Sequence, residues 1–489
     1  MKRVLPILHL TGFTMVIFSL TMLVPIGVAA VTDDGTLMAF VDSFVIGLLL
    51  GGIPFAVTRR QQRELQARDG FLLVSLAWTL LPLIAAIPLL IHFSRAGIPI
   101  SFTAAYFEAM SALTTTGATV LSNLDALPAA IHVWRAILVW VGGLGILVLA
   151  VAILPLLGVG GSQVVRAETP GPMKDDKLTP RIAGTAKALY AIYVGMSVLC
   201  WLAYLAVGLS GVDAFVHMCA TVALGGFSTL DANIGGFNSL AVEMVAIVFM
   251  LVSAINFATH YRVWRSRSLA AYRTCPETRY FLAIVLGCGL LVSVYLYASG
   301  IYSHVGDALR YGMFNAVSMA TTTGFANTDF AAWPPAVTLL MLVVSCFAAS
   351  SASTGGGIKL IRMLLVVRQA GFELLRLVHP RAVAPLRLGG RIVDPRVLQG
   401  VMGFLVLYAA TLLVATLLLL ASGLDGTTAV TAALASLNNT GTGLGLVGPA
   451  GSFANLTDFQ IWVCIVTMLL GRLELATVLV LFTPMFWRR

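Results

Sequence analysis

Four short stretches of the chain combine glycine with threonine, asparagine or small apolar residues in a way that could bind a small cation. They are Thr114-Thr115-Thr116-Gly117, Val222-Ala223-Leu224-Gly225, Thr321-Thr322-Thr323-Gly324 and Asn438-Asn439-Thr440-Gly441. Glycine permits the backbone angles that turn successive carbonyls toward one axis, and stacked carbonyls can replace the water around a monovalent cation. No acidic residue occurs within the four stretches, which disfavours a divalent cation. The residue types therefore predict a selectivity filter lined by backbone carbonyls.

The same layout surrounds all four turns, and it recurs at a period of roughly one hundred residues. Each turn follows a stretch that is too short and too polar to span a membrane and that opens with residues favoured at helix N-caps. These residues are Ser101 and Thr103, Asp213, Asp307 and Asp425. The pattern predicts four short pore helices whose partially negative C-termini point at the turns. One such turn alone would be an ordinary helix C-cap, but four at matching places indicate a pore.

The composition supports a membrane protein. The chain has 489 residues, of which 59% are hydrophobic and 10% are charged. Stretches of roughly 20 apolar residues, long enough to cross a bilayer, recur throughout it. Clear cases are Val4–Ala30, Phe71–Leu90, Ile137–Leu157, Phe281–Ala298 and Val401–Ala421. We interpret the first as a retained helix, although Lys2 and Arg3 precede it as they would precede a signal peptide.

The formal net charge of +9 is explained by loops on one side of the membrane. Lysine and arginine concentrate at the two termini and in four segments: Arg59–Arg68, Arg166–Lys187, Arg262–Arg279 and Lys359–Arg396. This is the positive-inside pattern, so these loops and both termini should face the cytoplasm. The basic residues orient the protein, and they indicate no nucleic-acid partner.

The basic loops divide the chain into five blocks. We predict an N-terminal helical hairpin at 1–57, followed by four pore repeats at 58–165, 166–265, 266–375 and 376–489. Each repeat should contain a helix, a pore helix and a second helix. The predicted fold is therefore an all-α integral membrane protein with about ten transmembrane helices, four repeats around a central pore and the extra hairpin.

Catalysis is disfavoured by the residues present. The six cysteines are scattered without metal-ligand spacing, and no His-Glu-x-x-His motif occurs. Glu108 is the only acidic residue between Asp69 and Asp125, so the first repeat offers no carboxylate pair. Phosphate-binding loops follow a strand, whereas the glycine-rich runs at 355–359 and 441–445 follow no predicted strand. A sodium- or proton-coupled symporter remains an alternative, although repeats that all share one orientation favour a pore.

Several further motifs occur in a recognisable order. They are Arg68-Asp69-Gly70-Phe71-Leu72-Leu73-Val74, Phe107-Glu108-Ala109-Met110-Ser111, Asn256-Phe257 with His260-Tyr261, Ser353-Thr354-Gly355-Gly356-Gly357-Ile358-Lys359, His379-Pro380 and Gly471-Arg472-Leu473-Glu474. With the four turns, they resemble the TrkH/TrkG/KtrB branch of the potassium transporter superfamily, and the TrkH type most. The resemblance runs essentially from end to end of the chain.

This resemblance implies potassium uptake across the bacterial cytoplasmic membrane by a channel-like, pore-forming subunit. It implies a homodimer in which each protomer has its own pore, and a cytosolic nucleotide-binding regulatory subunit of the TrkA type. The transported ion would be potassium, and we expect no organic cofactor on this chain. Membrane lipid is the other expected partner.

The resemblance also implies a gate below the filter, where the second helix of the third repeat is broken. The corresponding loop is Ala348–Gly357, which includes Ser353, Thr354, Gly355 and Gly356, and Lys359 follows it. Arg472 lies within the apolar stretch Ile461–Phe482, where a charge is costly and usually functional. It could hydrogen-bond the gate loop or slow cations, or it could extend to the cytoplasmic surface. Lys359 and Arg362 fit either the gate or simple anchoring at the cytoplasmic side.

Two departures from the family pattern affect the expected selectivity. Leu224 stands where the first and third turns have Thr116 and Thr323, and Thr442 stands where the family usually has proline. A filter with unequal quarters should select potassium less sharply than a fourfold-symmetric one.

Overall fold

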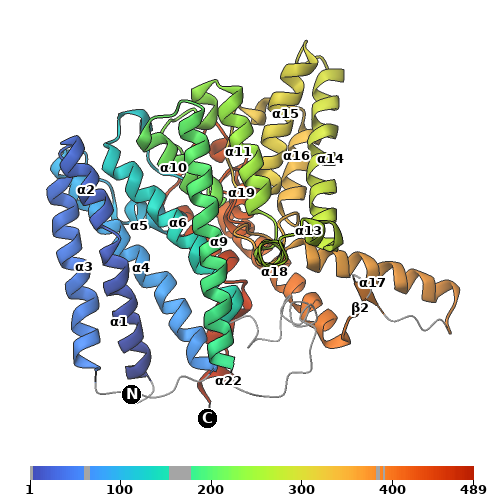
Figure 1. Ribbon diagram of the computed structural model, residues 1–489, viewed down its shortest axis with the longest axis horizontal. Coiled ribbons are helices and arrows are strands. Elements are labelled where there is room, and N and C mark those ends of the chain that lie inside the picture. The colour runs from blue at the N-terminus through green and yellow to red at the C-terminus, as the bar shows by residue number, and fades with distance from the viewer. Residues whose placement is uncertain (1–3, 60–66, 153–177, 382–385, 389–390, 489) are drawn as a thin grey trace.

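The computed structural model describes residues 4–59, 67–152, 178–381, 386–388 and 391–488 of the chain. In this part of the chain, helices make up nearly all of the regular structure (Figure 1). The first three, α1 (Val4–Leu20), α2 (Leu23–Thr32) and α3 (Leu37–Val57), pack as an N-terminal hairpin. The N- and C-termini lie at the same end of the molecule (Figure 1), as the charge pattern predicts.

Four units follow the hairpin, and each contains a long helix, a short pore helix and a second helix or a pair of helices. Unit 1 has α4 (Ala67–Arg95), α5 (Phe102–Leu113) and α6 (Ala129–Ala152); unit 2 has α9 (Leu178–Ala206), α10 (Gly211–Val222), α11 (Leu240–Ser253) and α12 (Phe257–Ser266); unit 3 has α14 (Pro276–Ala298), α15 (Val305–Ala320), α16 (Pro335–Ser345) and α17 (Leu360–Val378); unit 4 has α18 (Pro395–Ala421), α19 (Gly426–Leu437), α20 (Asp458–Arg472) and α21 (Ala476–Leu479).

Short elements connect these helices. They are the 3-10 turns η1 (Leu124–Ala126), η2 (Asn233–Phe237), η3 (Phe330–Ala332), η4 (Gly445–Val447), η5 (Phe453–Asn455) and η6 (Val480–Phe482), the helices α13 (Ala270–Thr274) and α22 (Pro484–Trp487), and the antiparallel strands β1 (Arg387–Leu388) and β2 (Arg391–Ile392). The exact limits of the units stay a prediction, and the limit between 165 and 166 lies outside the described residues.

The pore helices begin with side-chain caps in three of the four units. The Ser101 hydroxyl accepts from the Ala104 N–H of α5, and Asp425 caps α19 in the same way. Each such cap typically stabilises a helix by about 1 kcal/mol. Two expected caps were wrong. Ser210 rather than Asp213 caps α10, and α15 begins after His304 without a side-chain cap.

The second helices are broken in three units. In unit 2, α11 and α12 meet at an angle of 89°, and in unit 4, α20 and the helical segment that continues through η6 meet at 104°. In unit 3, residues 346–359 separate α16 from α17, which projects from the body of the molecule (Figure 1). The break in unit 3 was predicted, whereas the other two were not.

The breaks affect the number of spans. Among the described residues, six helices are long and apolar enough to cross a membrane, or up to eight when each bent pair is one span. Two further helices belong to the expected spans: α6, which has 24 residues, and α16, which has 11; the end of the expected span Ile137–Leu157 beyond Ala152 lies outside the described residues. The order of the helices agrees with the predicted all-α membrane fold.

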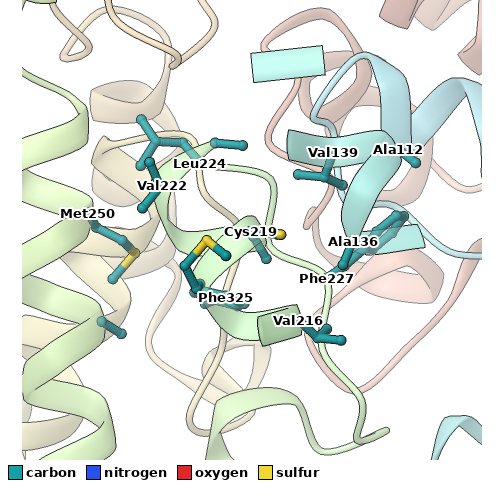
Figure 2. Packing of buried hydrophobic residues seen from close by; sticks show 14 of the residues in the cluster. Ala112, Ala136, Val139, Val216, Cys219, Val222, Leu224, Phe227, Met250 and Phe325 are labelled. Carbon is teal, nitrogen blue, oxygen red and sulfur yellow. The ribbon is translucent and has the colours of Figure 1, made fainter. Parts of the chain in front are cut away.

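The pore helices α5, α10 and α15 contribute to the main hydrophobic core, and α19 packs mainly in a second cluster. Figure 2 shows α10 between two second helices, with Ala136 and Val139 of α6 on one side and Met250 of α11 on the other. Cys219 and Val222 of α10 are almost completely buried in this packing. The core therefore surrounds the C-terminal ends of the pore helices and holds the turns that follow them.

Candidate functional site

All four pore helices end in the same backbone conformation. One non-glycine residue after each pore helix is left-handed, with φ of 53° at Thr115, 56° at Leu224, 58° at Thr322 and 52° at Asn439. Two residues further on, a glycine also has positive φ: 80° at Gly117, 62° at Gly226, 80° at Gly324 and 76° at Gly441. Non-glycine residues rarely adopt this conformation, so its repetition identifies four equivalent structures.

This geometry corrects the predicted second turn by one residue. Its left-handed pair is Leu224 and Gly226, so Gly226 rather than Gly225 is equivalent to Gly117. The hydrogen bonds agree, since the Gly225 N–H donates to a carbonyl five residues earlier at 2.8 Å, as the Thr116 N–H does. Val222 is then the last residue of α10 and not part of the turn. We call Thr114–Gly117, Ala223–Gly226, Thr321–Gly324 and Asn438–Gly441 the first to fourth turns.

The corrected alignment also changes the comparison made at Leu224. Leu224 occupies the place of Thr115 and Thr322, and Gly225 occupies the place of Thr116 and Thr323. The second turn, Ala223–Gly226, therefore has no side-chain hydroxyl at all. Its difference from the other turns is larger than the sequence comparison predicted.

The four turns meet backbone to backbone in a closed ring. A methyl group added to each of the four glycines would collide with the carbonyl oxygen that precedes the glycine of the next turn. The distances are 2.2 Å from Gly117 to Gly225, 2.1 Å from Gly226 to Thr323, 2.0 Å from Gly324 to Thr440, and 2.2 Å from Gly441 to Thr116. The ring runs first, second, third, fourth and back to first, and no side chain fits between neighbouring turns.

The threonine hydroxyls in the first and third turns bond behind the backbone. Thr114 Oγ1 donates to Met110 O at 2.7 Å and lies 2.7 Å from Thr116 Oγ1. In the third turn the equivalent Thr321–Thr323 pair is 2.8 Å apart. These bonds support the turns from behind, which leaves backbone carbonyls as the oxygens available to a cation.

The fourth turn uses amides for the same support. Asn439 Nδ2 donates to Thr116 Oγ1 at 3.0 Å and to Met468 O at 3.0 Å, which links the fourth turn to the first. Asn438 Oδ1 accepts from Tyr408 OH at 2.5 Å. With asparagine in place of the first threonine, Thr440 Oγ1 loses the partner that Thr116 has, and it is buried without a hydrogen bond among the described residues.

The predicted gate loop, Ala348–Gly357, lies directly against three of the units at the ring. Thr354 Oγ1 donates to Val222 O at 3.1 Å, at the end of the second pore helix. The Gly356 N–H donates to Thr322 Oγ1 of the third turn at 2.8 Å. A methyl group on Gly356 would lie 1.9 Å from Asn438 O of the fourth turn. The loop is therefore packed against the ring, where it can obstruct an ion path.

Arg472 connects this loop to the first unit. Its side chain is only 2% exposed, so the alternative in which it extends to the cytoplasmic surface is wrong. Nη1 donates to Thr354 O at 2.9 Å, and Nη2 donates to Gly142 O of α6 at 2.9 Å. Its Nε has no hydrogen-bond partner among the described residues. A buried guanidinium held by carbonyls keeps a positive charge next to the predicted ion path.

The predicted gate residues Ser353, Thr354 and Lys359 are also buried. Lys359 Nζ donates to Gly355 O inside the loop, and Ser353 Oγ donates to Ser350 O at 2.6 Å. A methyl group on Gly357, which has a φ of 75°, would lie 2.6 Å from Cys346 O. Anchoring at the membrane surface therefore does not explain Lys359.

Arg362, whose role the sequence left open between the gate and anchoring, forms an ion pair. It bonds to Glu474 in the break between α20 and α21, and its guanidinium carbon lies 4.0 Å from the centre of the Phe404 ring. Glu474 is therefore the partner of Arg362, and Arg472 bonds to carbonyls instead. The pair ties the start of α17 to the break in unit 4.

The break in unit 2 holds the same loop from another side. The Phe257 N–H, at the start of α12, donates to Ala352 O at 3.1 Å. Glu277 accepts from the Ser351 N–H at 2.6 Å and from Asn256 Nδ2 at 3.4 Å. Sequence reasoning quoted Asn256-Phe257 as a motif but gave these residues no role.

One buried ion pair behind the first turn was also missed. Glu108 of α5 bonds to Arg135 of α6 at 2.8 Å, and both side chains are buried. In the sequence, Glu108 stands out only as a lone acidic residue, and no pattern links it to Arg135, which is 27 positions away on another helix. Among the described residues, no group of three or more His, Cys, Asp or Glu side chains could hold a metal ion.

Comparisons with known proteins show the family and the fold of the chain. The TrkH family model, described as a cation transport protein, matches residues 36–489. The Trk system potassium uptake protein TrkH of Salmonella typhimurium is 44% identical over 482 residues, which is 99% of each chain. The TrkG protein of Escherichia coli is 39% identical and covers 98% of each chain. The crystal structure of the potassium transporter TrkH from Vibrio parahaemolyticus matches with a TM-score of 0.91 at 42% identity over 99% of each chain.

Proposed function

Because the chain belongs to the TrkH family of cation transport proteins, we propose that it takes up potassium ions through the ring of four turns. It is a multi-pass protein of the bacterial inner membrane. The single observation that carries the proposal is the closed ring of glycine–carbonyl contacts. The ring brings four equivalent sets of backbone carbonyls to one place, where they can replace the water around a monovalent ion.

The selectivity residues of this proposal are the four turns in their corrected alignment. Carbonyl oxygens of moderate field strength bind the ion without the deep well that carboxylates create, so the ion can leave again. The second turn, which has no hydroxyl to support it, is the weakest quarter of the ring. We therefore expect potassium to be preferred over sodium less sharply than in a ring of four identical turns.

The gate of this proposal is the Ala348–Gly357 loop with Lys359 and Arg472. The loop packs against units 2, 3 and 4, and Arg472 links it to unit 1. Opening requires the loop to leave these contacts, and it would also remove the barrier that a buried guanidinium presents to cations. The bond from Phe257 gives unit 2 a direct hold on the loop, and Glu277 of α14 connects the loop to Asn256 of unit 2.

Ion flux through the purified protein tests the proposal. In liposomes loaded with potassium, we expect the protein to carry potassium and rubidium at higher rates than sodium. Gly324→Ser adds atoms where a methyl group already lies 2.0 Å from Thr440 O, so it should abolish this flux. Gly403→Ser is the matched control because a side chain there meets nothing within 4 Å. Flux and ion preference that survive Gly324→Ser would place the ion path elsewhere.

The assembly is proposed from the family. The relatives are named as parts of a Trk potassium uptake system, and we infer a homodimer with one pore in each protomer. A cytosolic nucleotide-binding subunit of the TrkA type would act at the basic loops, and α17 beside them contacts the gate loop through its first residues. Light scattering of the purified protein, alone and with such a subunit, tests both statements.

A coupled symporter is the second candidate within the same family, and the absence of acidic residues in the turns disfavours it. Reversal potentials measured at several proton and sodium gradients separate the two. A potential that follows potassium alone supports a channel, and one that shifts with a second ion supports coupling. Because the relatives are named as transport proteins, we propose no catalytic role for this chain.

A further inference from the structure

Behind each turn, the pore helix is tied to the extended segment that follows the glycine. The tie begins at the same position in each pore helix, counted back from the glycine of the corrected turn. The residues at this position are Glu108, His217, Asn315 and Ala432. They differ in charge and in hydrogen-bonding capacity, although the turns they support have the same backbone conformation.

The tie in unit 1 is made by an ion pair. The Glu108 carboxylate accepts from Thr119 Oγ1 at 3.0 Å and from the Val120 N–H at 3.1 Å, both just beyond Gly117. Arg135 Nε donates to the same carboxylate at 2.8 Å. The side chains of Glu108 and Arg135 are 0% and 2% exposed, so the pair is removed from solvent.

Arg135 also reaches the neighbouring unit. Its Nη1 donates to Ser228 O, beyond the second turn, at 3.4 Å. Its guanidinium carbon lies 4.2 Å from the centre of the Phe227 ring. Its Nη2 donates to Thr119 Oγ1 at 3.3 Å. Arg135 therefore holds the segments after the first and second turns at a fixed separation.

The other units have neutral side chains at this position, although Asn327, the partner of Asn315, donates in turn to Glu243, which pairs with Arg310. His217 Nδ1 bonds to Asp213 O at 2.8 Å, so Nδ1 carries the proton and Nε2 accepts from the Ser228 hydroxyl at 2.9 Å. Asn315 Nδ2 donates to Asn327 Oδ1 at 2.6 Å. Ala432 has no polar side chain, and its neighbour Thr431 accepts from the Leu444 N–H at 3.0 Å instead.

The ion pair is a costly way to make this tie. Removing two charges from water costs more than their attraction usually returns, so a buried pair adds little net stability. What it provides is geometry, because the carboxylate and the planar guanidinium together hold four partners: Thr119, Val120, Ser228 and the Phe227 ring. The second turn, which has no hydroxyl support of its own, is the neighbour that Arg135 reaches.

We propose that Glu108 and Arg135 are positioning residues that set ion selectivity by holding the first and second turns at a fixed distance. This inference rests on the proposed function, in which the turns form the ion path. If the segments beyond these turns are free to move inward, the carbonyls can close around a smaller ion such as sodium. Without the pair, the ring should therefore lose discrimination before it loses conduction.

Three variants separate positioning from charge. Arg135→Met removes the link to Ser228, so the potassium-to-sodium flux ratio should fall about tenfold, the scale of a lost charged hydrogen bond. Glu108→Gln leaves a positive charge beside the path, so the potassium flux itself should also fall. The double variant E108Q/R135M carries no unpaired charge, so flux should recover while the ratio stays low. The surface pair Asp42–Arg95, changed to D42N/R95M, is the matched control and should alter neither quantity.

Flux in liposomes, with the amount of folded protein fixed by gel filtration, gives both readouts. A flux ratio that stays at the wild-type value in Arg135→Met and in the double variant overturns the inference. Should a single variant fail to fold because of its unpaired charge, the neutral double variant alone decides between the two outcomes. Wild-type protein that shows no potassium preference would instead contradict the proposed function, so the two failures are distinguishable.

Discussion

At the scale of single residues, the central finding is the difference between two adjacent glycines. Gly225 and Gly226 look interchangeable in the sequence, but only Gly226 has positive φ and faces the carbonyl of the next turn. A methyl group on Gly225 would instead lie 2.5 Å from Val139 Cγ1, a side-chain atom of α6. The first glycine is thus limited by packing and the second by the ring itself.

Substitution of these two glycines should therefore have different consequences. Gly226→Ala should abolish selective potassium flux, because its methyl group would lie 2.1 Å from Thr323 O and its φ is unfavourable for alanine. Gly225→Ala should be impaired alone but restored in a G225A/V139A double variant, which makes room for the methyl group. Potassium and sodium flux in liposomes measure both effects.

The V139A change, combined with each glycine variant in turn, also tests the corrected alignment. If V139A restored a Gly226→Ala protein and not a Gly225→Ala protein, the corrected alignment of the second turn would be wrong. Flux that is normal in both single variants would argue against the ring as the ion path.

At the scale of elements, three of the four second helices break at the level of the turns. The residues at two breaks, 254–256 and 473–475, include good helix formers, so intrinsic propensity did not reveal them. Tertiary contacts decide the backbone there, as the positive φ of Glu474 and Leu475 shows. The break in unit 3 was predictable because Ser350–Gly357 contains three glycines and a run of serine and threonine.

Displacing the gate loop should raise ion flux. Gly356→Ala puts a methyl group 1.9 Å from Asn438 O, and the fourth turn is held by the asparagine bonds, so the loop should be the part that moves. Arg472→Ala should act in the same direction by releasing Thr354. Gly287→Ala, in open space on α14, is the control. Unchanged or abolished flux in folded Gly356→Ala and Arg472→Ala proteins would speak against gating by this loop.

The sequence predicted elements better than contacts. Helix order, the four turns and the loop in unit 3 follow from repetition, N-cap residues and glycine runs. The alignment of the second turn did not, because two consecutive glycines leave the position ambiguous until φ is known. The partners of Arg472 are carbonyls on α6 and in the gate loop, and no sequence pattern identifies a carbonyl as a partner. The Glu108–Arg135 pair required knowing which helices face each other.

At the scale of the whole molecule, a carboxylate in the N-terminal hairpin contributes to its attachment to the first unit. Asp34 Oδ2 accepts from the Ala130 N–H at the start of α6 at 2.9 Å, and Oδ1 accepts from Thr36. Partial burial alone would raise the pKa of Asp34, but these hydrogen bonds outweigh it and hold the pKa below the usual 3.8. The contact lies outside the spans, where pH changes in the medium reach it.

Acid should weaken this attachment. Because the folded pKa is below 3.8, the carboxylate adds stability at neutral pH, and that contribution is lost as the pH falls below 3.8 through the folded pKa. We expect Asp34→Asn to lower the unfolding temperature at pH 7, and we expect the difference from wild type to shrink as the pH falls below 3.8. The exposed neighbour Asp33, changed to asparagine, is the control. A wild-type advantage that grew with acid would contradict this assignment.

The closed ring also dictates when an ion path can exist during synthesis. The bond from Asn439 to Thr116 joins residues 323 positions apart, which a ribosome makes about 15–65 s apart at the usual rates of translation. Three inserted units cannot close the circle, since the third turn still lacks its neighbour and the first is open on one side. In the proposed function, a chain interrupted before its last unit therefore has no complete ring and no selective path for potassium.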